Sequence, residues 1–206
     1  LNVTDGARES ANGGTRMKPR DIVLDQINHR ETNAVPYTLA FESEVSDRLD
    51  THYGDSAWRE RIDNYISHCP GPVGLIREPE PAPRVTDKFG TVWRTDRLPP
   101  AVVEPAIHTP SFDGYEFPSF EKLFDPQSKA DGIRSIEEAA DSFTVIMAGI
   151  CLWQSWYLRG FESTLSDCIL EEEFYAEVLD RYTDLTLSSI AECKDMSADA
   201  IMMGDD

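Results

Sequence analysis

Three carboxylates follow directly on apolar segments of this sequence, at positions suited to chemistry. Glu42 follows Phe41 at the end of one segment, and Asp205 and Asp206 follow Gly204 at the end of another. Neighbouring carboxylates can hold a cation, orient a substrate amine or exchange protons. The competing interpretation is that such an Asp caps the following helix. Asp205 and Asp206 are therefore candidate catalytic residues, and Phe41 and Glu42 are candidate substrate-binding residues.

An aromatic stretch after a third apolar segment gives a second group of candidates. It contains Trp153, Trp156, Tyr157, Arg159 and Phe161. These side chains could line an apolar pocket with an anion-binding guanidinium at its rim, or they could simply pack a helix against the core. Polar groups on Tyr157 and Arg159 require partners. We therefore take Tyr157 as a candidate catalytic residue, and Trp153 and Arg159 as candidate substrate-binding residues.

The sequence predicts no metal site and contains no common catalytic motif. Its four cysteines lie far apart, and only Cys69 has a neighbouring histidine, His68. Adjacent side chains of a strand point to opposite faces, so these two are poorly placed to share a metal. Phosphate-loop, nucleophile-elbow and zinc-protease motifs are all missing from the sequence.

Charge and hydropathy exclude several classes of partner. The chain has 19 basic and 38 acidic residues, a formal net charge of -19, which disfavours nucleic acid and anionic membrane surfaces. No apolar run reaches the roughly 20 residues of a membrane helix, and residues 1–16 lack the apolar core of a signal peptide. We expect a cytoplasmic protein with a flexible tail over residues 1–16.

Apolar segments alternate with helical patterns along the rest of the chain. Strands are expected at 35–41, 143–149 and 200–204, with a weaker one near 64–69, and residues 68–118 form a long Pro-rich insertion. Helices between such strands favour an α/β fold with parallel strands and outer helices. A (β/α)8 TIM barrel needs eight strands, so these residues supply about half of one.

Four segments of the sequence, in order, carry a resemblance to a known family. They are residues 17–36, 87–93 (DKFGTVW), 156–162 (WYLRGFE) and 198–206 (ADAIMMGDD). Together they resemble the uroporphyrinogen decarboxylase superfamily, which includes cobamide-dependent methyltransferases. The resemblance implies a (β/α)8 barrel with its pocket at the C-terminal mouth. Residues 17–206 are then expected to form the N-terminal half of that barrel, with an incomplete active site.

Comparison with the decarboxylases of this superfamily shows agreements and departures. Tyr157 matches a pocket tyrosine, and Asp206 falls where the decarboxylases have a pocket serine. They also carry an Arg-rich motif after the first strand and an Asp after the second, whereas here Glu42 has no arginine beside it and His68-Cys69 lacks a carboxylate. A carboxylate at Glu42 would repel a polycarboxylate substrate. Decarboxylation of a porphyrinogen is therefore disfavoured.

The leading hypothesis is a corrinoid-linked methyltransferase of this superfamily, present as an N-terminal fragment that is inactive alone. The alternatives are a uroporphyrinogen decarboxylase and a binding module without chemistry. The resemblance implies zinc and a corrinoid for complete methyltransferases, but no residue of this segment supports either cofactor. Expected partners are a small-molecule substrate or a corrinoid protein, and a homodimer is left open.

Overall fold

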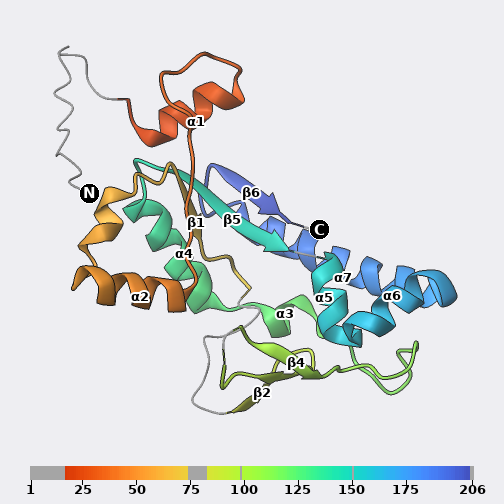
Figure 1. The fold of residues 1–206 in the computed structure, drawn as a ribbon. Coiled ribbons are helices and arrows are strands. Elements are labelled where there is room, and N and C mark those ends of the chain that lie inside the picture. Colours follow the sequence, from red (N-terminus) through yellow and green to blue (C-terminus); the bar gives the residue numbers. More distant parts are fainter. Residues whose placement is uncertain (1–16, 74–82, 98, 150, 205–206) are drawn as a thin grey trace, which may run out of the picture.

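Helices and strands alternate along the chain in a mixed α/β arrangement. A computed structural model describes residues 17–73, 83–97, 99–149 and 151–204 (Figure 1). In chain order the elements are α1 (Pro19–Ile27), α2 (Ser43–Tyr53), a 3-10 helix (Ala57–Arg61), β1 (Ile66–Cys69), β2 (Arg84–Thr86), β3 (Val92–Arg94), β4 (Ala101–Glu104), α3 (Phe120–Leu123), α4 (Pro126–Glu138), β5 (Phe143–Gly149), α5 (Cys151–Arg159), α6 (Phe161–Leu170), α7 (Glu172–Cys193) and β6 (Ala200–Met203).

The main sheet contains three parallel strands in the order β1-β5-β6. Ile66 lies opposite Phe143 on the neighbouring strand, and Val145 lies opposite Ala200. Because the strands are parallel, their C-terminal ends meet at one edge of the sheet. The predicted strands at 143–149 and 200–204, and the weaker one near 64–69, are confirmed.

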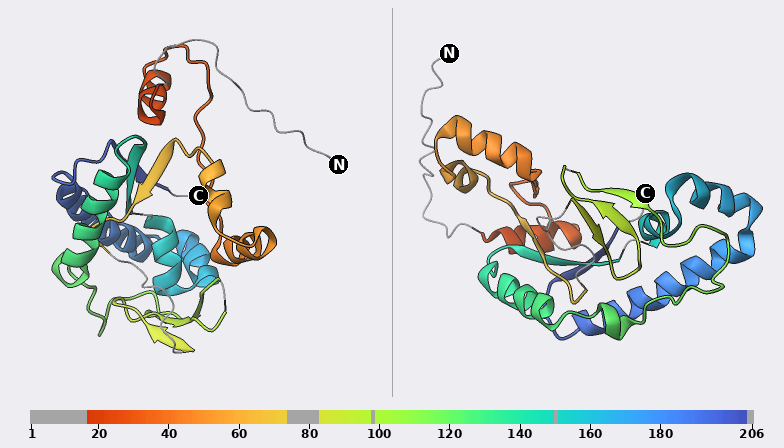
Figure 2. Two further views of the ribbon diagram at one scale, coloured as in Figure 1. Left: turned by 90° about the vertical axis from the view of Figure 1, so that its left-hand side faces the viewer. Right: turned by 90° about the horizontal axis from the view of Figure 1, so that it is seen from below.

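Two apolar clusters cover the two faces of this sheet. On one face, Cys69 and Ile146 pack against Ile136 of α4 and Cys193 of α7. On the other face, the cluster includes Val23 of α1, Phe143 and Val145, with Ile66, Ala200 and Met202 packed against it. Figure 2 shows α4 and α7 along one side of the sheet. We call the opposite side, which carries α1, the α1 face.

A buried carboxylate ties α1 to the sheet. Asp199, just before β6, accepts hydrogen bonds from Arg20 Nε at 2.8 Å and from the backbone N–H of Thr144 at 3.0 Å. Burial opposes ionisation of Asp199, but these donors outweigh it and lower its pKa. The network holds α1 over the N-terminal end of the α1 face.

The predicted strand at 35–41 is wrong, since the structure assigns no strand there. The segment is extended and runs beside β1, but its pairing is incomplete. Tyr37 C=O accepts from Tyr65 N–H at 2.9 Å, whereas Leu39 N–H donates to the side chain of Asn64 at 2.8 Å. Pro36 has no N–H to donate. A side-chain amide thus replaces the backbone partner that a ladder would need.

The Pro-rich region forms a second, separate sheet. Strands β2, β3 and β4 pair antiparallel in that order. Asp87 organises the first turn by accepting from the backbone N–H groups of Phe89 and Thr91 and from Trp93 Nε1, at 2.8 to 2.9 Å. The insertion was expected to start at residue 68, but β1 continues to Cys69, so it begins after that strand.

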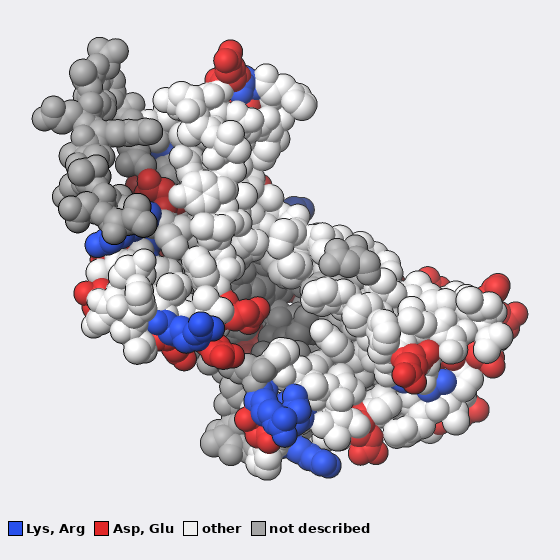
Figure 3. All heavy atoms as spheres, in the orientation of Figure 1, with Lys and Arg blue, Asp and Glu red and all other residues white. Residues whose placement is uncertain are grey.

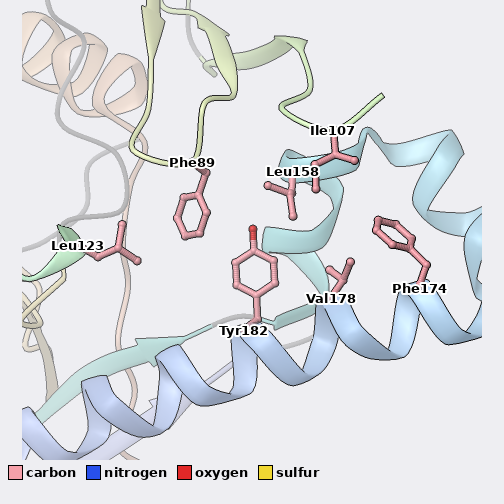
Figure 4. Packing of buried hydrophobic residues seen from close by; sticks show 7 residues of the cluster. All are labelled: Phe89, Ile107, Leu123, Leu158, Phe174, Val178 and Tyr182. Carbon is pink, nitrogen blue, oxygen red and sulfur yellow. The ribbon is translucent and has the colours of Figure 1, made fainter. Parts of the chain in front are cut away.

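The insertion packs firmly on the helices that follow β5. Figure 4 shows Tyr182 pointing from α7 into the space between Phe89 of the insertion and Leu158 of α5. Its hydroxyl donates to the Gln154 carbonyl at 3.0 Å. Backbone contact is direct as well, because Ile107 N–H donates to the Leu158 carbonyl at 2.9 Å. The insertion therefore holds α5 in place at the end of β5.

Within the described ranges, no helix combines the length and the apolar character that crossing a membrane would require. Figure 3 shows acidic side chains gathered at the end of the molecule formed by α6 and α7.

Candidate functional site

The candidate site is the edge of the main sheet where its parallel strands end. In sheets of this kind, loops after the strands converge on one edge and carry the functional groups. β5 ends at Gly149, and α5 begins at Cys151. A Cβ on Gly149 would lie 2.5 Å from Thr186 Oγ1 of α7, so only glycine permits this close approach. The approach brings α7 close to the C-terminal end of β5.

Aromatic side chains of α5 lie together near this edge. The ring centroids of Trp153 and Trp156 are 6.1 Å apart, and Trp156 contacts Phe161 edge-on at 4.8 Å. Both indole N–H groups are buried, and neither has a hydrogen-bond partner among the described residues. Buried donors normally find a partner, so these two N–H groups are unusual among the described residues.

Tyr157 lies on the side of α5 that faces the insertion. Its ring contacts Trp93 edge-on at 4.7 Å, and its carbonyl accepts from Thr91 Oγ1 at 3.0 Å. Burial raises the pKa of the Tyr157 hydroxyl, which keeps it protonated at neutral pH. Tyr157 can therefore donate a hydrogen bond but is a poor base.

Arg159 is engaged within the protein. Its Nε donates to Asp167 of α6 at 2.8 Å, and its guanidinium also donates to the His108 carbonyl at 2.9 Å. The side chains of Arg159 and Asp167 are only 11% and 6% exposed. This buried pair joins α5, α6 and the insertion. An anionic ligand would have to compete with Asp167 for the guanidinium, and the substrate-binding role of Arg159 stays a prediction.

No contact among the residues that the structure describes brings the remaining predicted residues to α5. Phe41 packs edge-on against Trp58 at 5.4 Å. Glu42 is exposed and occupies the N-cap position of α2 without a side-chain capping bond. Asp205 and Asp206 lie outside the described residues. Their predicted catalytic roles are therefore not tested.

A small cavity beside the end of β5 does not provide a substrate pocket. Its volume is about 30 Å³, and its lining includes Ala148, Gln154 and Thr186. This is room for a water molecule or two. No group of three His, Cys, Asp or Glu residues in the described ranges could hold a metal ion.

His68 is a further polar residue near this edge, and the sequence analysis weighed it only as a metal partner of Cys69. The structure separates the two: Cys69 is buried against α4 and α7, whereas His68 is exposed and lies opposite Val145. His68 therefore belongs to the α1 face, near the C-terminal end of β1. The strand alternation that argued against a metal pair would also have indicated this position.

No protein-family model and no curated protein matches this chain. Among solved structures, a methyltransferase from Methanosarcina mazei is similar, with a TM-score of 0.62 and 15% sequence identity. The match covers 92% of this chain but 59% of that chain, so this chain spans less than two thirds of its length. At this identity the likeness is one of fold. The expected superfamily membership stays a prediction.

Proposed function

We propose that this chain is part of a corrinoid-linked methyltransferase of the uroporphyrinogen decarboxylase superfamily, built on a (β/α)8 barrel. The observation that carries the proposal is the fold likeness to a methyltransferase over 92% of this chain. The consecutive parallel order β1-β5-β6, with helices between the strands, is compatible with part of such a barrel. In such a barrel, the substrate would bind at the C-terminal ends of the strands.

The proposed roles follow from the chemistry of the residues. Trp153 would donate a hydrogen bond to the substrate, because its indole N–H has no partner among the described residues. Tyr157 would donate a hydrogen bond, because its raised pKa keeps the hydroxyl protonated. Asp205 and Asp206 follow β6 in the sequence and would supply carboxylates at the same edge.

Cofactors and partners of the complete enzyme are part of the same proposal. A corrinoid, when bound, supplies a methyl group that can be transferred to an acceptor. The described residues do not fit a zinc site, because no three His, Cys, Asp or Glu side chains among them lie close enough together to hold a metal ion. The expected partner is a corrinoid protein or a small-molecule substrate. A homodimer is compatible with the same proposal.

Decarboxylation of a porphyrinogen is the second candidate and is less well supported. Its substrate carries several carboxylates and requires cationic side chains. Arg159 is the described cation of α5, and Asp167 already neutralises it. Glu42 adds a negative charge where arginines would be needed. The electrostatics therefore argue against a polycarboxylate substrate.

The test is an anaerobic assay of the full natural polypeptide with methylcobalamin and 2-mercaptoethanol, following the loss of methylcobalamin absorbance. We expect corrinoid-dependent turnover, and we expect Tyr157→Phe to lower kcat/KM while Tyr53→Phe, an exposed control, leaves it unchanged. Turnover of uroporphyrinogen without any corrinoid dependence would favour the decarboxylase. Ligand binding that neither Tyr157→Phe nor Asp206→Ala alters, with no turnover, would favour a binding module.

A further inference from the structure

Among the residues of strands β1, β5 and β6, one titratable side chain lies on the α1 face of the main sheet. Strand register and the apolar clusters assign to this face Ile66 and His68 of β1, Phe143, Val145 and Met147 of β5, and Ala200 and Met202 of β6. Among these seven, only His68 can exchange a proton. Every other member is apolar.

Around His68, side chains of this face are exposed in the described part of the chain. α1 covers the N-terminal part of the strands, where Phe143 and Val145 are only 6% exposed. Towards the C-terminal ends, Met147 is 37% exposed and His68 is exposed as well. In the described part of the chain, no hydrogen bond or ion pair involves the His68 imidazole. The His68 imidazole is thus available for hydrogen bonding on a mainly apolar surface, at the edge of the sheet where the C-terminal ends of the strands meet.

We propose that His68 contacts the substrate and binds its polar group, while the neighbouring thioethers of Met147 and Met202 contact its apolar body. This inference rests on the proposed function, because it assigns the substrate to the same edge of the sheet. The two nitrogens of an imidazole ring can take part in hydrogen bonds with a polar group. The matching ligand is a small molecule with a thiol, hydroxyl or carboxylate at one end of an apolar body.

The alternation of the strand explains why His68, and not its neighbours, has this role. Ser67 and Cys69 belong to the opposite face, where Cys69 is buried against α4 and α7. Burial also raises the pKa of the Cys69 thiol, so it is not a competing nucleophile or ligand. His68 is the residue that β1 presents to the open side.

The test combines kinetics with a binding measurement on the full natural polypeptide. In the methylcobalamin assay, His68→Gln and His68→Leu are compared with His52→Gln, an exposed histidine on α2. Loss of one substrate hydrogen bond should lower kcat/KM roughly tenfold or more in His68→Leu, with His68→Gln less affected. His52→Gln should stay within about twofold of the parent. Thermal melts confirm that each variant folds.

The binding measurement does not require turnover. Imidazole resonances of ¹³C-labelled histidine are followed while short-chain thiols, alcohols and carboxylates are added, and the His68 signal is identified from its loss in His68→Gln. We expect at least one probe to shift the His68 signal selectively. Selective shifts without any methyl transfer would keep this inference and reject the proposed function. Methyl transfer that His68→Leu leaves unchanged, or no selective shift, would overturn the inference.

Discussion

Replacing Asp199 by alanine should destabilise the protein through one buried hydrogen-bond network. Thr144 is 3% exposed, and both its backbone N–H and its hydroxyl donate to Asp199 Oδ2, at 3.0 and 3.2 Å. Alanine leaves the buried N–H without this acceptor, which costs about 1–3 kcal/mol. Arg20 also loses its partner, but its side chain is 42% exposed and adds little. We therefore expect a loss of about 1–3 kcal/mol for Asp199→Ala.

The assay is urea unfolding followed by circular dichroism, with Asp141→Ala as the matched control. Asp141 pairs with Lys18, and the two side chains are 73% and 60% exposed, so its removal should leave the free energy of unfolding unchanged within error. Equal stability of Asp199→Ala and Asp141→Ala would refute the reasoning. It would show that water satisfies Thr144 as well as the carboxylate does.

The same network predicts a pH dependence with a defined sign. The pKa of Asp199 is lower in the folded protein than its ordinary value, so the unfolded state binds the proton first as pH falls. Its stabilisation is therefore complete above the unfolded pKa of about 4 and is lost as pH falls through the folded pKa. The difference in unfolding free energy between the parent and Asp199→Ala should shrink below about pH 4. A difference that grows on acidification would contradict this sign.

Three further predictions concern other parts of the molecule. Asp87→Ala should cost roughly 2–5 kcal/mol in urea unfolding, because the turn donors, including the indole of Trp93, lose their acceptor. Gly132→Ala should lower stability by about 1–3 kcal/mol, since its Cβ would lie 2.2 Å from the Pro70 carbonyl oxygen; an unchanged Tm would show that α4 can shift freely. At pH 8, Cys193 should react with iodoacetamide far more slowly in the folded than in the urea-unfolded chain, because burial raises its pKa, and mass spectrometry of the labelled peptides measures both rates.

The local sequence pattern predicted the buried strand Phe143–Gly149 correctly. It did not predict the conformation of residues 35–41, which lie beside β1. Phe143–Gly149 is apolar except for Thr144, and strands on both sides complete its ladder, so pattern and structure agree. Residues 35–41 have a similar character, but their described backbone partners lie just before β1, where the Asn64 side chain occupies a ladder position. An edge segment has fewer partners to enforce strand geometry than a central one.

The candidate residues of α5 were found from composition, but their roles depend on contacts distant in sequence. Aromatic and polar residue types at 153–159 indicated either a pocket or a packed helix. The structure shows packing, because Trp156 contacts Phe161 and Asp167 engages Arg159, whereas a substrate pocket at these residues stays a prediction. No pattern around Arg159 reveals that partner, because α6 must first fold back on α5.

The sequence alone determined the alternation of apolar strands with helices, the separate character of the Pro-rich region and the positions of the aromatic candidates, since these follow from short-range periodicity and residue type. Tertiary structure decided which face each side chain joined. His68 and Cys69 are neighbours in the chain, yet one is exposed on the α1 face and the other is buried under two helices. That assignment depends on strand register and on the helices covering each face, which are long-range contacts.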